Sequence, residues 1–479
     1  MRRAVAVLSI LAAATVVAPS SFARAAAPSS VSVSPAASPI SGPVGPLGHD
    51  GRWLVDATGR VVTLHGVNEV AKSAPYYPAS IGFSDDDAAF LAQHGFGAVR
   101  LGVVWSGLEP SPGAISSSYI DHIVDTVHVL AAHHIFVLLD FHQDGWGPAV
   151  HGNGAPAWAT ITDGLPNPPV PFPLYYIENP ALQRAFENFW NNRPASDGVG
   201  LQDHYVAAAR AVAARVANDS NVIGYDPMNE PWPGANWQPC LTGCAAQERA
   251  SLVPFYNKFS NAIRSVDPNH LVLPEPFSLF NFGDGPTSLP AIGAPNNALA
   301  YHVYATTPAL NFSVMQQAVA ASQRNGDGLL ATEWGAITDP VMIRQEADQF
   351  DLKQLSWLFW SYNDEVVLDS TSPPTGANVD APVLFALARP YPLLTDGVPR
   401  SFTYHQSTHV FTDTFSTRRL DGTVDHSGVS VISLPPGAYP HGYTVSVTGA
   451  TVASQNAFEI QLRNQPGATT VSLTVVPTP

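Results

Sequence analysis

The chain has 479 residues, which is enough for two or three domains of ordinary size. Hydrophobic residues make up 45% of it and aromatic residues 10%, so a large core can form and wholesale disorder is excluded. Acidic residues outnumber basic residues by 38 to 22, which argues against nucleic-acid binding, because that requires clusters of Lys and Arg.

Residues 1–27 have the pattern of an export signal. Arg2 and Arg3 precede an apolar stretch at residues 4–18, and the small residues at 23–27 offer cleavage sites. A retained membrane anchor is the alternative, although the apolar run is short for a spanning helix. We therefore expect a secreted protein. Residues 28–48, rich in Ser, Pro, Ala and Gly, predict a flexible lead-in.

Cys240 and Cys244 are the two cysteines of the chain. In an exported protein we expect them to form a disulfide that closes a small loop. A metal site at these thiols is not expected, because no nearby residues supply the further ligands. His142 and Asp144 would also need a third ligand. We therefore expect neither a metal nor a cofactor.

From about residue 50 to residue 390, short apolar runs alternate with helical stretches. The runs are nearly continuous and rich in Val, Leu, Ile and aromatic residues, which is typical of parallel strands buried on both faces. Helices are predicted at 84–95, 117–134, 203–218, 247–266, 313–324 and 340–351. The pattern predicts an α/β fold, a (β/α)8 TIM barrel forming the domain 49–390. The eight runs are 61–67, 98–103, 135–142, 222–226, 270–275, 299–304, 329–333 and 356–362.

The connection between the third and fourth runs is unusually long. Residues 145–173 hold seven prolines and five glycines, together with Trp146, Trp158 and Phe172. Such a loop is a lid or binding loop, or else it is disordered, and its aromatic residues favour an ordered loop.

After about residue 390 the helical pattern ends. Four segments rich in Thr, Ser and Gly alternate apolar and polar residues, which predicts a small antiparallel β-sandwich domain at residues 391–479. These segments are 429–434, 443–448, 458–463 and 469–476.

Polar and aromatic residues stand at the C-terminal ends of the predicted strands, where enzymes of this fold carry their chemistry. Because they follow eight strands of one ring, we expect them to face a common cavity. They are Asn68, Arg100, His142, Asp144, Asn229, Glu230, Glu275, His302, Tyr304, Glu333 and Trp360.

Two carboxyl groups in this set are candidates for acid–base and nucleophilic catalysis. Glu230 follows the fourth strand within Asn-Glu-Pro, and Glu333 follows the seventh within Thr-Glu-Trp-Gly. Hydrolysis of a glycoside needs one carboxyl group that is protonated and one that is ionised. The alternative is that each glutamate caps a helix or pairs with an arginine. Trp360 could offer its flat face to a sugar ring, or it could be an ordinary core residue.

The motif Asn229-Glu230-Pro231 resembles glycoside hydrolase family 5, over residues 50–390. The resemblance implies a retaining double displacement, in which Glu230 is the acid/base and Glu333 the nucleophile. It implies that Asn229 binds the 2-hydroxyl group of the sugar. The other matching residues are Arg100, His142, His302, Tyr304 and Trp360, of which Arg100 and Tyr304 would keep the nucleophile ionised. Arg100 is expected to lower the pKa of Glu333.

Three segments, at residues 65–72, 140–146 and 360–364, look like the endoglycoceramidases of this family, which cleave between a glycan and ceramide. This narrower resemblance implies that Lys72, His142 and Asp144 bind the first sugar. Two lipid chains would need an apolar trough. Candidates for lining it, unless they pack in the core, are Trp146, Trp158, Phe172, Phe277, Phe280 and Phe282.

The resemblance leaves other functions open. The substrate could instead be a β-glucan, or a simple glucosyl- or galactosylceramide cleaved by an exo-acting enzyme. A carbohydrate-binding protein without catalysis is a further alternative. The expected partners are a glycosphingolipid or another β-glycoside, with transient contact with a membrane or micelle surface, and no nucleic acid.

Overall fold

The structure is a computed structural model that describes residues 29–31, 42–283, 285–293 and 295–478. The predicted export signal lies outside the described residues. The predicted lead-in contains one short strand, β1 (Ser29–Val31), which pairs with β17 (Tyr443–Thr448). In the part of the chain that is described, no helix has both the length and the apolar character needed to cross a bilayer.

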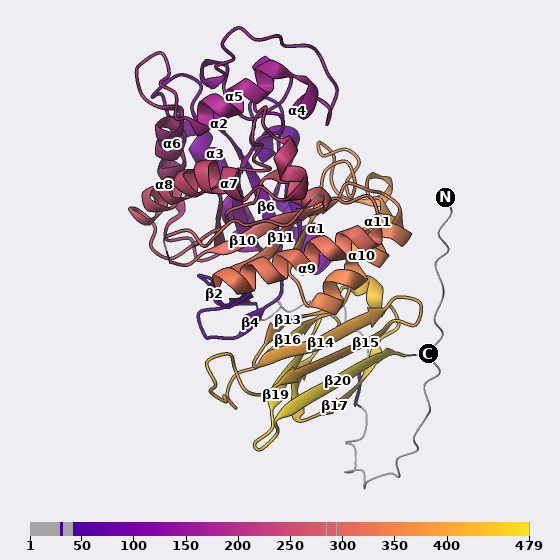
Figure 1. The fold of residues 1–479 in the computed structure, drawn as a ribbon. Helices are drawn as coiled ribbons and strands as arrows, with labels where there is room; N and C mark the ends of the chain where they lie inside the picture. Colours follow the sequence, from indigo (N-terminus) through magenta and orange to yellow (C-terminus); the bar gives the residue numbers. More distant parts are fainter. Residues whose placement is uncertain (1–28, 32–41, 284, 294, 479) are drawn as a thin grey trace, which may run out of the picture.

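Eight parallel strands form a nearly closed barrel, which confirms the predicted (β/α)8 fold (Figure 1). The strands are β5 (His65–Glu69), β6 (Ala98–Val104), β7 (Phe136–His142), β8 (Val222–Asp226), β9 (Leu271–Val272), β10 (Ala298–Val303), β11 (Gly328–Gly335) and β12 (Trp357–Trp360). The two strands at the ends of the sheet order are β9 and β10, and a parallel bridge between Val272 and Asn297 joins them.

Helices follow most of these strands and cover the outside of the barrel. The helix predicted at 247–266 is interrupted, since a π-helical turn (Glu248–Leu252) separates α7 (Ala245–Gln247) from α8 (Val253–Arg264). The others are α1 (Asp85–Gln93), α2 (Trp105–Leu108), α3 (Ser117–Ala132), α6 (Leu201–Val216), α9 (Pro308–Asn325), α10 (Pro340–Lys353) and α11 (Ala381–Leu387).

The long connection between β7 and β8 is ordered and contains two helices that the sequence pattern did not predict. They are α4 (Tyr175–Glu178) and α5 (Pro180–Trp190). The buried Asn179 caps α5 by accepting from the Leu182 amide, and its own amide donates to Asn167 within the Pro-rich loop. This side chain therefore fixes the loop to the helix that follows it.

A two-sheet antiparallel β-sandwich follows the barrel, as predicted. One sheet has the order β1-β17-β20-β15-β14 and the other β18-β19-β16-β13-β4-β3-β2. Its remaining strands are β2 (Gly48–Asp50), β3 (Trp53–Val55), β4 (Val61–Val62), β13 (Tyr391–Thr395), β14 (Val398–His405), β15 (Val410–Ser416), β16 (Ser430–Ser433), β18 (Ala450–Gln455), β19 (Glu459–Asn464) and β20 (Thr470–Pro477).

The predicted first barrel strand, 61–67, is two strands in the structure. Val61 and Val62 form β4 and pair with Leu394 and Thr395 of β13 in the sandwich, whereas the barrel strand β5 begins at His65. The two strands follow one another in a single apolar run, so hydrophobicity alone did not separate them.

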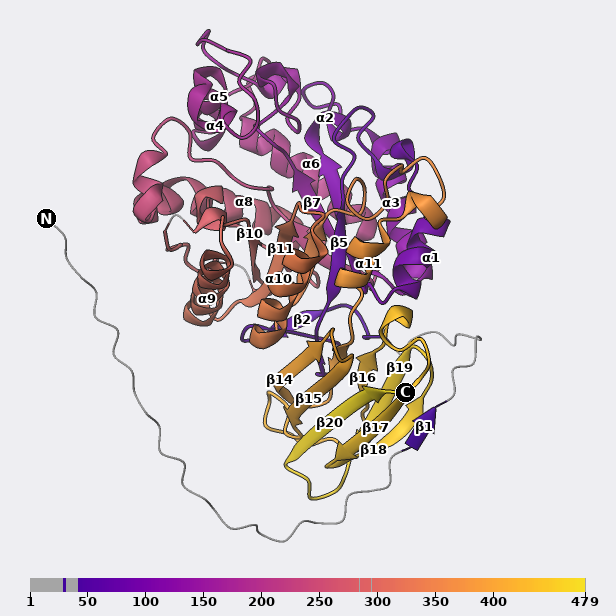
Figure 2. The same ribbon diagram turned by 90° about the vertical axis from the view of Figure 1, so that its right-hand side faces the viewer.

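The sandwich lies against the N-terminal ends of the barrel strands (Figure 2). One cluster of buried side chains joins the starts of the barrel strands, such as Ala98 and Phe136, to sandwich residues such as Leu393 and Phe402. Arg389 adds ion pairs to Asp351 and Asp348 of α10. The sandwich therefore covers one end of the barrel and leaves the C-terminal ends of the strands free.

Candidate active site

A cavity of about 790 Å³ opens where the barrel strands end. Six of the ten residues predicted to act at the site line it, namely Lys72, Asp144, Glu230, Tyr304, Glu333 and Trp360. The other four, Arg100, His142, Asn229 and His302, are buried beneath these residues, with at most 2% of their surface exposed. Two layers therefore form the site: a lining that a substrate can touch, and a layer that supports it.

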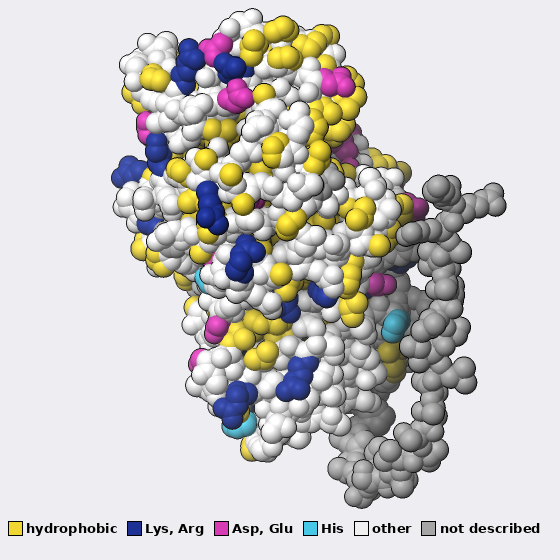
Figure 3. All heavy atoms as spheres, in the orientation of Figure 1, with side chains coloured by type: hydrophobic (Ala, Val, Ile, Leu, Met, Phe, Trp, Pro, Cys, Tyr) yellow, Lys and Arg dark blue, Asp and Glu magenta, His cyan; other side chains and the backbone are white. Residues whose placement is uncertain are grey.

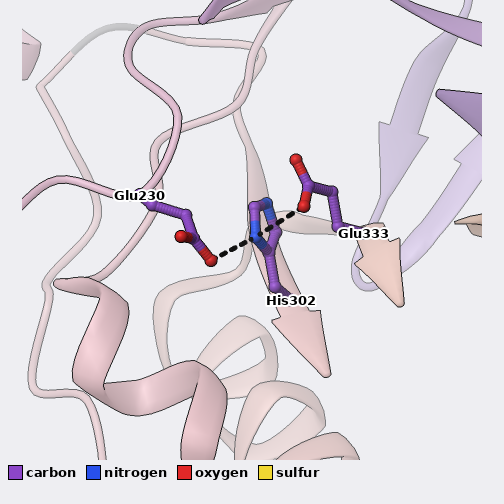
Figure 4. Close-up of side chains that lie close together, drawn as sticks. All are labelled: Glu230, His302 and Glu333. Atoms are coloured by element: carbon purple, nitrogen blue, oxygen red, sulfur yellow. Dashed lines mark hydrogen bonds and ion pairs between the residues drawn. The ribbon is translucent and has the colours of Figure 1, made fainter. Parts of the chain in front are cut away.

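The two predicted catalytic carboxyl groups lie side by side with His302 between them (Figure 4). One side-chain oxygen or nitrogen atom from each of Glu230, His302 and Glu333 lies within 4.8 Å of the other two. Glycosidases that retain the anomeric configuration hold their two carboxyl groups roughly 5–5.5 Å apart, close enough for direct attack on the sugar. The spacing therefore suits double displacement. The same three groups could ligate a metal ion, but Glu230 and His302 are already hydrogen bonded to each other.

Glu333 is held at both oxygens. Arg100 Nη1 donates to its Oε1, and the Tyr304 hydroxyl donates to its Oε2 at 2.8 Å. Burial raises the pKa of Glu333 above its ordinary value, although the charges of His302 and Arg100 act in the opposite direction. The expected effect of Arg100, which lowers the pKa of Glu333, is therefore present, but burial outweighs it.

Glu230 is held in an uncommon backbone conformation. Its φ is 43°, in the left-handed region that non-glycine residues rarely adopt. Its amide donates to Glu275 Oε2 at 3.1 Å, and its carboxyl oxygen Oε1 accepts from Asn281 at 3.2 Å and lies 3.0 Å from His302 Nδ1. Such conformations persist only where neighbouring groups enforce them, and they cluster at active sites.

Arg100 is the centre of the supporting layer. It is fully buried and extends from β6 beneath both catalytic residues. Burial opposes its charge, but the surrounding carboxylates outweigh this and raise its pKa well above the usual value. Its partners are Asn68, Asp140, Asp226, Asn229, Glu275 and Glu333.

A polar wall of the cavity is formed by Lys72, Asp144 and Trp360. The Lys72 ammonium group lies 2.7 Å from Asp144 and 4.1 Å from the centre of the Trp360 ring. His142 stacks behind Trp360 with a centroid distance of 5.5 Å and lies 3.3 Å from Asp144 and 2.7 Å from Asp140. Trp360, which is partly exposed, and the charged pair beside it offer an aromatic surface and hydrogen bonds to a sugar.

Charges of opposite sign lie together in the polar wall. Burial alone would lower the pKa of His142, but Asp140 and Asp144 raise it to about 9. Burial would raise the pKa of Asp144, but Lys72 and His142 hold it well below its usual range. At neutral pH Lys72 and His142 are therefore cations and Asp144 is an anion.

Asn229 has its side chain committed to the protein. Its Oδ1 accepts from Arg100 at 2.9 Å, its Nδ2 donates to the backbone carbonyl of Gln143 at 3.0 Å, and it does not line the cavity. The role at the sugar 2-hydroxyl that the family resemblance implies stays a prediction.

A second, apolar wall completes the lining of the cavity. It consists of Val170, Pro171, Phe172 and Tyr175 from the long loop and of Phe282 from the turn Ser278–Phe282. Phe172 is 63% exposed and Phe282 38% exposed. Four other aromatic residues proposed for an apolar trough do not line this cavity; they pack in the barrel core or under the loop: Trp146, Trp158, Phe277 and Phe280.

Sequence reasoning missed several residues that position the site. Asp140 holds both His142 and Arg100, and a charged residue within a continuous apolar run was the available signal. Gln143 binds the backbone carbonyls of Asn229 and Glu230, and Asn281 binds the carboxyl group of Glu230. Both lie in loops, where no periodicity marks them.

Cys240 and Cys244 form a disulfide in the loop after β8, as predicted.

Comparison with known proteins agrees with this geometry. The profile of Cellulase (glycosyl hydrolase family 5) matches residues 55–366, and that of the Glycoside hydrolase family 5 C-terminal domain matches residues 389–475. Endoglycoceramidase I of Rhodococcus hoagii is 32% identical over 440 residues, covering 86% of this chain and 84% of the relative. Glucosylceramidase of Rhizopus delemar is 27% identical over 245 residues, or 40% of this chain and 36% of the relative.

Among solved structures, Endo-glycoceramidase II from Rhodococcus sp., in its ganglioside GM3 complex, superposes with a TM-score of 0.74 at 28% identity. The match covers 89% of this chain and 99% of the other. The resemblance inferred from sequence motifs is thus confirmed by relatives that span both domains. With a profile match over most of its barrel and a second match over its sandwich, the chain belongs to glycoside hydrolase family 5 and is a glycoside hydrolase.

Proposed function

We propose that this enzyme hydrolyses the bond between the glycan and the ceramide of glycosphingolipids, with retention of configuration. The observation that carries the proposal is the pair of unlike walls that meet at Glu230 and Glu333. One wall is charged and aromatic and the other is apolar. A substrate with a sugar at one end and a lipid at the other matches both walls, and the endoglycoceramidase relatives support this choice.

In the proposed reaction Glu333 attacks the anomeric carbon while Glu230 gives its proton to the leaving oxygen of ceramide. Glu333 then forms a glycosyl ester, and Glu230, now ionised, accepts a proton from the water that hydrolyses it. Tyr304 and Arg100 hold the attacking carboxyl group in position. The Lys72–Asp144 pair and Trp360 bind the sugar that carries the anomeric carbon.

The apolar wall would receive the ceramide and touch the lipid aggregate that contains it. Exposed apolar side chains continue outward from it, with Leu174 and Ile177 next to Phe172, and Leu310 beside the loop that carries Phe282. Figure 3 shows hydrophobic side chains gathered near α4 and α5, at the end of the molecule far from the sandwich. With the export signal, this surface supports a secreted enzyme that contacts membranes or micelles transiently.

Mass analysis of the products from a ganglioside in detergent micelles tests the proposal. We expect intact oligosaccharide and free ceramide, and we expect neither product from Glu333→Gln. Release of single sugars from the far end of the glycan would instead indicate an exo-acting enzyme. Cleavage of a β-glucan without cleavage of any glycolipid would indicate an endoglucanase. Activity that survives Glu333→Gln would contradict the assignment of the nucleophile.

A further inference from the structure

Glu275, which follows β9, contacts both catalytic residues through the supporting layer but does not line the cavity. Its carboxyl group accepts from the Glu230 amide at 3.1 Å, lies 3.1 Å from His302 Nε2, and pairs with Arg100 Nη2 at 3.3 Å. Arg100 in turn binds Glu333. One buried carboxyl group thus holds the backbone of the acid/base, orients the imidazole beside it, and adjoins the cation that binds the nucleophile.

Asp226, at the end of β8, is the second member of this arrangement. Arg100 Nη2 donates both to Asp226 Oδ2 at 2.8 Å and to Glu275 Oε1 at 3.3 Å, so the two buried carboxyl groups meet at one nitrogen. Burial and the charge of Glu275 raise the pKa of Asp226 well above its usual range, as expected where two carboxyl groups crowd one cation. Asp226 Oδ1 meets no donor among the described residues, whereas Glu275 also accepts from the Glu230 amide and forms an ion pair with His302. The charge therefore belongs on Glu275 and the proton on Asp226.

The charges of the whole site require the same proton. Burial would lower the pKa of His142 and of His302, but adjacent carboxylates raise both pKa values. The four basic groups of the site are therefore cations at neutral pH, namely Lys72, Arg100, His142 and His302. Six carboxyl groups surround them, and a buried site is most stable when its charges cancel. Cancellation requires two protons, one on the general acid and one on Asp226. The carboxyl groups are Asp140, Asp144, Asp226, Glu230, Glu275 and Glu333.

We propose that Glu275 is a positioning residue for catalysis: it fixes the backbone of Glu230 and directs the imidazole of His302 toward the Glu230 carboxyl group. With His302 Nε2 paired to Glu275 Oε1 at 3.1 Å, Nδ1 faces Glu230 Oε1 at 3.0 Å. Glu275, His302 and Glu230 then form a chain along which the acid proton is held in place. This inference rests on the proposed role of Glu230 as acid/base.

The charged and titratable groups around Glu275 come from several elements. Arg100 faces it from β6, Asp226 from β8, His302 from β10, and Tyr256 of α8 donates its hydroxyl to the Glu275 backbone carbonyl at 2.7 Å. Burial lowers the pKa of His302, but the charges of Glu275 and Glu333 outweigh it and raise that pKa well above its usual value. A neutral residue in place of Glu275 would therefore make the protons on His302 and Glu230 easier to lose.

The test is the pH profile of kcat/KM for Glu275→Gln and Asp226→Asn. For Glu275→Gln we expect the basic limb to move to lower pH by about one unit. We also expect kcat to fall about 100-fold on a substrate with a poor leaving group, and much less on a dinitrophenyl glycoside, which needs no protonation. Asp226→Asn replaces a neutral group by a neutral group, so its basic limb should stay at the wild-type pH.

Glu248→Gln is the matched control, because Glu248 is a buried glutamate held by Thr287 and Ser288 away from the cavity. Glu248→Gln can destabilise the fold, but it should not shift the basic limb of the pH profile. The inference would be overturned if the basic limb of the pH profile did not shift in Glu275→Gln, or if it shifted equally in Glu275→Gln and Asp226→Asn. If Glu275→Gln does not fold, infrared spectra still decide: the wild type must show a protonated-carboxyl band that Asp226→Asn removes. A wild type that cleaves no glycoside would instead refute the proposed function.

Discussion

The two walls of the cavity differ in how their residues are placed. The polar wall is formed by residues next to the ends of barrel strands, and the buried His142 contacts two of them, Asp144 and Trp360. The apolar wall is formed by loop residues such as Phe172, more than half of whose surface is exposed. The polar wall is therefore preorganised for one geometry, whereas the apolar wall can adapt to chains of different length. The difference predicts that changes in the two walls will affect different substrates.

The largest effect is expected between the walls, at Glu230. Glu230→Ala should lower kcat on a glycolipid by about 1,000-fold or more, because the leaving oxygen loses its proton donor. On a dinitrophenyl glycoside the glycosyl ester should still form, and added azide should restore turnover and give a glycosyl azide. Rescue by azide without formation of that product, or no rescue at all, would count against Glu230 as acid/base.

The polar wall should show a pH-dependent contribution to stability through His142. Its folded pKa of about 9 exceeds the unfolded value of 6.5, so the contribution is complete below about pH 6.5 and is lost as pH rises through 9. At 1.36 kcal/mol per unit the loss is about 3 kcal/mol, a factor of about 100 in the unfolding equilibrium. Denaturant titrations at pH 6 and pH 9.5 measure it, and His142→Gln should flatten the difference. If His142→Gln lost as much free energy of unfolding between pH 6 and pH 9.5 as the wild type, groups other than His142 would cause the effect.

Lys72→Met should impair every substrate that carries the sugar. The change keeps an unbranched side chain over Trp360 but removes the charge that pairs with Asp144. We expect kcat/KM to fall roughly 10- to 100-fold on glycolipid and on soluble aryl glycoside alike. Lys258→Met is the control, since Lys258 forms an ion pair with Asp203 on the outside of the barrel. A loss confined to the glycolipid would mean that Lys72 does not bind the sugar.

The smallest effect is expected at the apolar wall, and only for lipid substrates. Phe172→Ser should lower activity on micellar glycolipid by about 10-fold, as expected for the loss of one exposed aromatic contact, while a soluble aryl glycoside is unaffected. Leu352→Ser, at the end of α10 far from the strand ends that form the site, removes an equally exposed residue and serves as the control. Equal losses on both substrates would remove the distinction between the walls.

The barrel and the polar wall could be predicted from the sequence because both depend on position along strands. Continuous apolar runs marked the eight strands, and residues next to their ends, such as Glu230, Glu333 and Trp360, line the cavity. The first run was misjudged because β4 and β5 follow one another without a polar break.

Among the described residues, four of the twelve sandwich strands were predicted as part of the sandwich, and for three of the others the reason is identifiable. Pro392 and Pro399 lie within β13 and β14, and proline is depleted from strands. In β15, Asp413 occupies an inward position between Phe411 and Phe415, which breaks the apolar alternation. The apolar wall was predicted only in part. Phe172 and Phe282 line the cavity as predicted, whereas Phe277 and Phe280, identical in type and close in sequence, are core residues, because loop conformation decides which side chains face the cavity.

The pairing of β4 with β13 brings the two ends of the chain into one sheet. Residues 48–62 are synthesised first, yet their neighbour in the sheet comes from the last quarter of the polypeptide. A nascent chain halted before residue 391 would carry an open strand edge with Val61 and Val62 uncovered. Assembly of the catalytic barrel is thereby coupled to completion of the whole polypeptide, and truncation at the barrel boundary should give an aggregation-prone product rather than a smaller enzyme.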